Sequence, residues 1–248
     1  MLLKAQAQAA SSGISNTTES WLAQYDLDNY DCDKCNNTGS ICWHDENYVF
    51  HSEKCECKKV RRSIRSLRKS GMMDMIERYT FENYETPDAE RRRIKETAQA
   101  FCRAKSGWLY IHGRAGSGKT HICTAVCNSM IMQGNSLKYM LWRDESVELK
   151  ALVNYQEDYN ERMQRLKTVK VLYIDDFFKS KNVTDADINL AFELLNYRYN
   201  DSKLRTIISS EKSIEDILSY DEAVGSRIYE RCKNGFYIDA PDENWRLK

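Results

Sequence analysis

The residues with the clearest chemistry form the octapeptide 113–120, Gly-Arg-Ala-Gly-Ser-Gly-Lys-Thr. An apolar run, 108–112, precedes it, and a helical pattern begins at Lys119. A strand, a glycine-rich turn and a helix are the context of a phosphate-binding loop, in which backbone N–H groups and a helix N-terminus face an anion. We expect Lys119 to reach the β- and γ-phosphates and the Thr120 hydroxyl to ligate Mg²⁺. The sequence therefore predicts a nucleoside triphosphate site made of Gly113, Gly116, Ser117, Gly118, Lys119 and Thr120.

Two acids end a second apolar run, at Asp175 and Asp176. An apolar strand that ends in two acids is typical of the second half of such an ATPase site. Asp175 is expected to hold Mg²⁺ directly or through water, and Asp176 to orient or deprotonate the attacking water as a general base. The alternative is an aspartate pair that only caps a loop. A third run, 204–211, should lie beside this strand, where a polar group at its end can sense the γ-phosphate.

Five of the nine cysteines fall between residues 32 and 57. Cys32 and Cys35 form a C-x-x-C knuckle followed by a turn-rich sequence, and Cys55 and Cys57 form a second pair. Four thiolates in two pairs match a tetrahedral structural zinc site, which would fold a segment too small to fold alone. Redox-sensitive or metal-free thiols are the alternative. Further residues of this stretch are possible substitute ligands: Cys42, His44 and His51.

The elements that must position these residues alternate between strands and helices, which is typical of an α/β fold with a parallel sheet. Strands are expected at 108–112, 137–142, 169–176, 204–211 and 236–238, and helices at 119–133, 144–166 and around 225–231. A basic amphipathic helix is predicted at 58–69, with Val60, Ile64 and Leu67 on its apolar face. Contact with nucleic acid or an acidic partner and a solvated connecting helix are both open readings of it.

The composition fits one α/β domain with a small module in front of it. The chain has 248 residues, 42% hydrophobic residues and a formal net charge of zero, so nucleic-acid binding would need a local patch. No apolar run is long enough to span a membrane, and residues 1–7 do not resemble a secretory signal, so a cytoplasmic protein is expected. We divide the chain into a partner-binding region, 1–70, with the zinc module at about 30–58, and an ATPase domain, 71–248. Residues 1–30 are either an element that orders on binding a partner or a frayed tail.

The order of these motifs resembles the DnaC-type replicative helicase loaders, especially those encoded by phages and prophages. The resemblance extends from about Cys32 to the C-terminus and includes the glycine loop, Ile-Asp-Asp at 174–176, Ile-Ile-Ser-Ser at 207–210 and Gly-Ser-Arg-Ile at 225–228. It implies an AAA+ core with a five-stranded parallel sheet, which binds ATP and Mg²⁺ and self-associates through its ATP interface. It also implies two partners, a replicative helicase hexamer and single-stranded DNA.

The resemblance further assigns roles to basic residues. Arg227 is the implied arginine finger on the ATP of a neighbouring subunit, with Arg231 as the substitute; an ordinary surface salt bridge is the alternative for Arg227. A helix within 145–166 is implied to contact single-stranded DNA. The charges available near it are Arg143, Lys150, Arg162, Arg165 and Lys167, with acids mixed among them.

The chain departs from the family pattern in two places. Ser209-Ser210 is followed by Glu211, which would repel a γ-phosphate, so Ser210 is expected to act as the sensor and Glu211 to point elsewhere. No helical lid domain is expected after the last strand, and this predicts slow hydrolysis that DNA or a partner stimulates. Two rival functions remain: a transposition helper ATPase of the IstB type acting on duplex DNA, and a nucleotide-binding scaffold that does not hydrolyse ATP.

Overall fold

The structure is a computed structural model that describes residues 31–69, 73–180 and 182–247. It divides into two compact units, 1–65 and 66–248, which are described separately. The boundary lies within helix α3 (Cys57–Lys69). Residues 1–30, for which a partner-binding element or a frayed tail was expected, lie outside the described residues.

The first unit contains a two-stranded antiparallel hairpin, β1 (Ser40–His44) and β2 (Phe50–Lys54), and the start of α3. Its core is a cluster of cysteines, Cys35, Cys55 and Cys57, with Cys32 and Ile41 packed against it. On α3, Val60 and Arg61 are buried, and the Arg61 guanidinium donates to the Asn37 side chain at 2.6 Å. Val60 therefore faces inward as the amphipathic pattern predicts.

The second unit is built on a parallel sheet of five strands in the order β4-β5-β6-β3-β7. The strands are β3 (Leu109–His112), β4 (Leu137–Leu141), β5 (Val171–Phe177), β6 (Arg205–Ser210) and β7 (Tyr237–Asp239). All five expected strands form, within a few residues of the expected bounds. The predicted five-stranded parallel sheet is confirmed.

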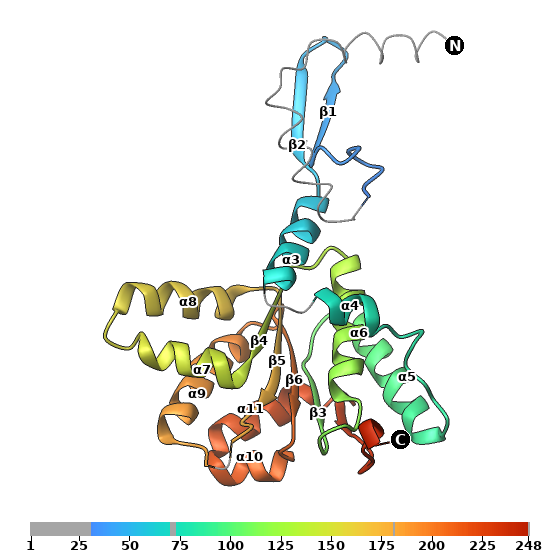
Figure 1. Cartoon of the computed structure of the whole chain (residues 1–248). Coiled ribbons are helices and arrows are strands. Elements are labelled where there is room, and N and C mark those ends of the chain that lie inside the picture. The colour runs from blue at the N-terminus through green and yellow to red at the C-terminus, as the bar shows by residue number, and fades with distance from the viewer. Residues whose placement is uncertain (1–30, 70–72, 181, 248) are drawn as a thin grey trace. The chain divides into compact units, whose positions relative to one another are not determined.

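Helices cover both faces of this sheet (Figure 1). One group is α4 (Met73–Arg78), α5 (Ala89–Arg103) and α6 (Lys119–Met132). The other is α7 (Trp142–Ala151), α8 (Gln156–Thr168), α9 (Asp185–Asn200), α10 (Ile214–Tyr220) and α11 (Glu222–Cys232). A short 3₁₀ helix, η1 (Trp245–Leu247), follows β7. Because both faces are covered, the strands are apolar runs rather than alternating patterns.

The structure corrects the single helix expected over 144–166. The helix begins earlier, at Trp142, because this ring is buried edge-on against Phe177 and Phe178. It ends at Ala151, and a turn closed by the Tyr155 N–H to the Leu152 carbonyl, at 2.7 Å, separates it from α8. No glycine or proline occurs between the two helices, and Asn154 is the single residue there that favours a turn, so the sequence signal for a break is weak.

Candidate nucleotide-binding site

The glycine loop connects β3 to α6, and three of its glycines have left-handed backbones. Their φ angles are 151° at Gly113, 83° at Gly116 and 93° at Gly118. A Cβ at Gly113 would lie 2.9 Å from the Ala240 Cβ, and one at Gly116 would lie 1.9 Å from the Asn244 side-chain oxygen. Glycine is therefore required at both positions by conformation and by space. The loop delivers the chain directly into the N-terminus of α6 at Lys119.

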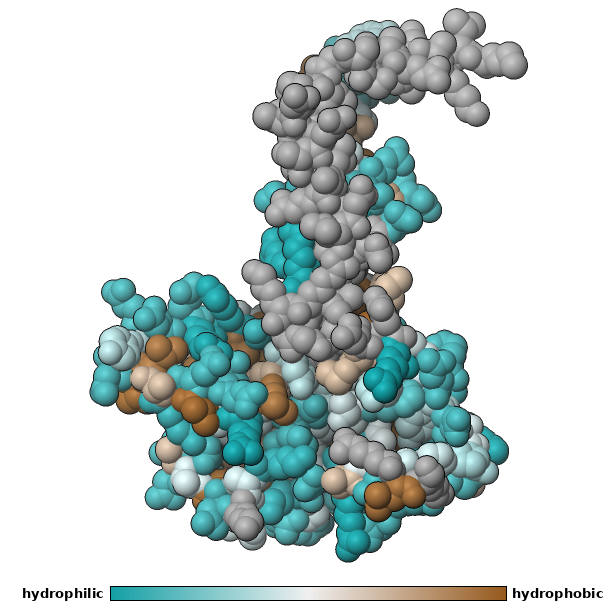
Figure 2. Space-filling view, in the orientation of Figure 1, coloured by the Kyte–Doolittle hydropathy of each residue, from teal (hydrophilic) through white to brown (hydrophobic). Residues whose placement is uncertain are grey.

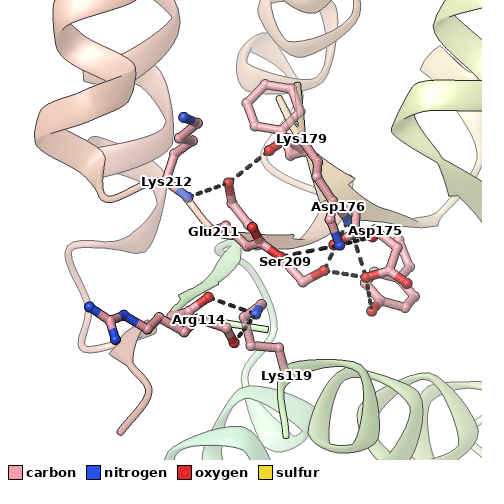
Figure 3. A network of polar contacts seen from close by, with 12 residues as sticks. Arg114, Lys119, Asp175, Asp176, Lys179, Ser209, Glu211 and Lys212 are labelled. Atoms are coloured by element: carbon pink, nitrogen blue, oxygen red, sulfur yellow. Dashed lines mark hydrogen bonds and ion pairs between the residues drawn. The ribbon is translucent and has the colours of Figure 1, made fainter. Parts of the chain in front are cut away.

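Lys119 lies across its own loop. It is only 6% exposed, and its Nζ donates to the carbonyls of Gly113 and Arg114 at 2.7 and 2.8 Å (Figure 3). Burial lowers its pKa below the ordinary lysine value, although Glu211 and Asp176 act in the opposite direction. The loop carbonyls thus hold the ammonium group where it can donate hydrogen bonds to a phosphate on the loop.

A cleft of about 240 Å³ opens beside Lys119. Its polar part brings together residues from three elements: Thr120 on α6, Asp176 near the end of β5 with Lys179 just after it, and Glu211 after β6. The rest of its wall is Tyr79, Ala115, Gly116, Gly118, His121 and Trp245. The sequence-predicted loop and Asp176 of the acid motif therefore meet at one cavity, at the carboxyl ends of the strands, where ligands of open α/β sheets bind. Asp175 is not among the residues that line it.

The two acids of β5 occupy different positions. Asp175 is buried, and its Oδ1 accepts from the Tyr173 hydroxyl at 2.8 Å, from the Ser209 hydroxyl and from the Asp176 N–H at 3.2 Å. Its other oxygen, Oδ2, accepts from the Tyr139 hydroxyl at 3.3 Å. Asp176 lines the cleft, has a φ of 53°, and lies in a stretch where the register of β5 against β6 shifts. A bulge of this kind re-aims side chains next to a functional site.

Lys179 is a cleft residue that the sequence motifs do not reveal. Its Nζ contacts Asp176 Oδ2 at 3.0 Å and Glu211 Oε1 at 3.1 Å (Figure 3). Burial acts to lower its pKa, but these two carboxylates outweigh it and raise the pKa. The only local signal is its position three residues after Asp176. A cation here partly neutralises the two acids that face the phosphate end of the cleft.

The structure differs from the sequence expectation at Ser210, the expected γ-phosphate sensor, and at Glu211, which was expected to point away from the site. The Ser210 hydroxyl is buried and donates to the Phe177 carbonyl at 2.7 Å, so it ties two strands together and does not line the cleft. Ser209 is the serine that contacts Asp175. Glu211, expected to point elsewhere, lines the cleft, and Lys179 offsets its charge.

Arg227 lies on α11 and does not line the cleft of its own chain. Its Nε donates to the Asn196 side chain at 3.0 Å, and its guanidinium lies 4.9 Å from the Phe192 ring centroid and 5.5 Å from that of Tyr199. Arg231, the substitute finger, donates to the Leu204 carbonyl at 3.3 Å. The arginine finger remains a prediction, and only a neighbouring chain's cleft is available to it.

The basic residues expected to contact DNA are mostly paired within the chain. Four of them contact carboxylates: Lys150 with Asp187, Arg162 with Glu145 and Glu148, Arg165 with Glu161, and Lys167 with Glu193. Arg143 is exposed. Apolar side chains also gather over α7 and α8 (Figure 2), where Val147, Val153 and Tyr155 are more than half exposed. This helical pair is therefore not a strongly basic surface.

The four cysteines chosen from the sequence lie together. Their sulfurs are all within 4.8 Å of one another, with Sγ–Sγ distances of 3.7 Å for Cys32–Cys55 and 3.4 Å for Cys35–Cys57. Burial acts to raise the pKa of Cys35, but hydrogen bonds from the Cys57 thiol and the Gly39 N–H lower it to about 7. The substitute ligands lie outside this cluster: Cys42 contacts Ser52, His44 packs on Phe50, and His51 contacts Asp45 at 2.9 Å.

Comparison of the sequence with known proteins shows to which family the chain belongs. Residues 34–236 match the family described as IstB-like ATP binding protein. The chain belongs to this family. It is 31% identical over 218 residues to the uncharacterized protein YqaM of Bacillus subtilis (strain 168), covering 81% of this chain and 68% of that protein.

One further relative and one solved structure are also similar to this chain. The replicative helicase loader DnaC of Buchnera aphidicola subsp. Baizongia pistaciae (strain Bp) is 26% identical over 148 residues, which cover 57% of this chain and 60% of that protein. A crystal structure of the DnaC helicase loader matches with a TM-score of 0.60 at 23% identity, covering 67% of this chain and 98% of that one. These similarities confirm the predicted IstB/DnaC-like AAA+ ATPase domain. Within the described ranges, no helix is long and apolar enough to cross a membrane.

Proposed function

We propose that this protein is an ATP-dependent loader that binds a ring-shaped replicative helicase and helps to place it on single-stranded DNA. The observation that carries the proposal is the convergence of the glycine loop, Lys119 and Asp176 on one cleft, in a chain that belongs to the IstB/DnaC-like ATPases. ATP binding and hydrolysis would switch the protein between an assembled and a released state.

The cleft residues divide the work on ATP. The loop N–H groups and Lys119 bind the phosphates. The loop carbonyls of Gly113 and Arg114 hold the Lys119 ammonium group beside the loop. A Mg²⁺ ion, which neutralises phosphate charge when bound, would be held by the Thr120 hydroxyl and by Asp175, whose hydroxyl contacts fix its carboxylate. Asp176 lines the cleft and is the general base for water, with Lys179 holding it in place.

Arg227 would complete the site of a neighbouring subunit. Its guanidinium is held against two aromatic rings and one side-chain amide on the surface of α9 and α11. A planar, always-charged group suits the neutralisation of charge that develops on the γ-phosphate. Self-association through this interface follows as part of the proposal, as does slow hydrolysis in the isolated subunit.

The cysteine cluster supplies a structural zinc site in the partner-binding region. Four sulfurs within 4.8 Å of one another fit a tetrahedral Cys₄ site, and they leave no open position for catalysis. In our proposal zinc orders residues 31–58, and the region 1–70 grips the helicase while 71–248 self-associates and touches DNA. The ion-paired surface of α7 and α8 indicates that phosphate contacts through these helices are few.

Native mass spectrometry with candidate replicative helicases tests the proposal. With ATP present, we expect a defined complex with a helicase hexamer, whose mass also reports the zinc content. Lys119→Ala should abolish the ATP dependence of this complex, whereas Lys105→Ala, at an exposed position outside the cleft, should leave it intact. Failure to bind any helicase, together with ATP-driven self-assembly, would contradict the loader proposal.

The second candidate is a transposition helper that assembles on duplex DNA, which the name of the matched family favours. Fluorescence anisotropy with matched single-stranded and duplex oligonucleotides, in the presence of ATP, separates the two. A loader should prefer the single strand and a transposition helper the duplex. ATP that is bound but never cleaved, with DNA and partner both present, would instead indicate a scaffold.

A further inference from the structure

The segment that follows β7 runs along the glycine loop and contacts it at alternate positions. The Ala240 N–H donates to the His112 carbonyl at 2.8 Å, and Asp242 forms an ion pair with the Arg114 side chain at 2.7 Å. The Trp245 backbone N–H then donates to the Gly116 carbonyl at 3.0 Å. Residues 240–245 therefore follow the phosphate-binding loop from its first residues to its middle.

Trp245 is held in place from the other side by Arg91 of α5. The Arg91 guanidinium lies 4.1 Å from the Trp245 ring centroid, and its Nη2 contacts Glu243 at 2.9 Å. The Arg91 side chain is only 3% exposed, so this cation–π contact is largely shielded from water. The Arg91 guanidinium of α5 therefore holds the indole, while the Trp245 backbone is tied to the glycine loop.

Trp245 also lines two adjoining cavities. One is the phosphate cleft described above, and the other, of about 230 Å³, is lined by residues 83–85 and Arg91. Gly118, His121 and Trp245 line both of them. The His121 ring packs on Tyr79 of the first cleft, with 4.8 Å between centroids, and meets the edge of Tyr84 of the second cavity at 5.2 Å. A polar cleft at the glycine loop thus continues past an indole into an aromatic-lined cavity.

We propose that Trp245 contacts the nucleoside of the bound nucleotide and that segment 240–247 closes the nucleotide cleft. The inference rests on the ATP binding of the proposed function and adds a chemical assignment to it: the triphosphate lies on the loop, and the flat nucleoside lies against the indole. Aromatic side chains are general stacking partners for nucleic-acid bases, because every base has a π-face. The segment thereby encloses the nucleotide within a single subunit, in place of the helical lid domain that the sequence does not predict.

Calorimetric titrations of the full-length protein with Mg²⁺-ATP and with Mg²⁺-tripolyphosphate test the inference. Tripolyphosphate has the phosphates but no nucleoside. We expect Trp245→Ala to weaken ATP binding about tenfold and to leave tripolyphosphate binding within about twofold, because the lost contact is to the nucleoside. Trp245→Phe, which keeps an aromatic ring, should restore ATP binding to within about threefold of the wild type. Trp43→Phe, in the separate β1–β2 hairpin, is the matched control and should change neither affinity.

Equal weakening of both ligands by Trp245→Ala would overturn the inference, because it would mean that Trp245 only supports the loop. Unchanged ATP affinity would overturn it as well. If Trp245→Ala folds poorly, tryptophan fluorescence of the wild type, Trp43→Phe and Trp245→Phe gives the answer instead. ATP should change the emission of the wild type and of Trp43→Phe but not that of Trp245→Phe. A wild-type protein that binds neither ligand would instead refute the proposed ATPase function itself.

Discussion

The two units of this chain bury different kinds of side chain. Between residues 31 and 65 the clustered core consists of Cys35, Cys55 and Cys57, beside a hairpin of two five-residue strands. Apart from this cluster, the large buried side chains among the described residues there are Val60 and Arg61 of α3. The sheet unit instead buries a continuous apolar cluster that includes Trp108, Tyr110 and Phe177. Apolar burial can stabilise a domain of the second size, whereas a segment of the first size usually needs a metal or another cross-link. The comparison teaches that the cysteine-rich unit and the sheet unit should lose their structure independently.

Removal of metal is the strongest way to test this difference. Cys55→Ser should unfold residues 31–58, because the proposed Cys₄ zinc site would contribute on the order of 10 kcal/mol to folding. The second unit should keep its thermal transition within a few degrees. Hydrogen exchange read segment by segment measures both outcomes. Cys42→Ser is the matched control, since Cys42 is exposed and outside the cluster; joint melting of both units would contradict the independence we expect.

Within the sheet unit, the largest single loss should come from Arg198. It is fully buried, and its guanidinium donates to the Thr206 hydroxyl and to the carbonyls of Leu166, Lys167, Val169 and Arg205 at 2.7–3.0 Å. Arg198→Met leaves these acceptors without a donor and should lower the free energy of unfolding by roughly 4 kcal/mol.

Urea denaturation, followed by far-UV circular dichroism, measures this loss. Arg165→Met is the control, because Arg165 forms an exposed pair with Glu161 and should cost less than about 1 kcal/mol. Equal effects of the two substitutions would show that the buried guanidinium is not what joins α8 to the sheet.

Gly116→Ala should damage the nucleotide site more than the fold. The new methyl group would collide with Asn244, and the backbone has a φ of 83°. Gly134→Ala is a matched control, since Gly134 has a φ of 81° but nothing within 4 Å of its added Cβ. Both should lose about 1 kcal/mol from backbone strain. Only Gly116→Ala should also lose ATP affinity, by about tenfold or more in calorimetry, and similar affinities for the two variants would refute the close contact.

The smallest expected effect concerns the N-terminus of α9. Burial acts to raise the pKa of Asp187, but the ion pair with Lys150 at 2.6 Å and the Thr184 hydrogen bonds outweigh it, and the pKa is lowered. A carboxyl whose folded pKa is lowered stabilises the fold above its unfolded pKa of about 3.9 and loses this contribution as the pH falls through the folded value.

Asp187→Asn should therefore cost about 1 kcal/mol near pH 7, and the difference from the wild type should shrink below about pH 4. Thermal denaturation as a function of pH measures it. The exposed neighbour Asp185, changed to Asn, should have a smaller effect that does not follow this pH profile. A pH-independent difference for Asp187→Asn would show that its charge is not involved.

Local chemistry was enough to predict the glycine loop, the acids of β5, the five strands and the four clustered cysteines. Glycine spacing, apolar runs and paired cysteines are properties of short segments, so the sequence displays them directly. The sequence could not determine which of Ser209, Ser210 and Glu211 contacts Asp175 and which of them lines the cleft. A strand alternates its faces every residue, and the register shift between Ile174 and Phe177 decides which side chain meets Asp175.

The sequence by itself determined the chemistry of this protein: a phosphate-binding loop, two acids and a cysteine cluster, each encoded within a few residues. Only the tertiary structure decided which distant groups join them. Lys179 enters the cleft because of the irregularity at the end of β5, and the Trp245 backbone reaches Gly116 although the two residues lie far apart in the sequence. Such contacts depend on the order of strands in the sheet and on the direction in which β7 leaves it. No local pattern records that direction, because it is set by the packing of the whole sheet.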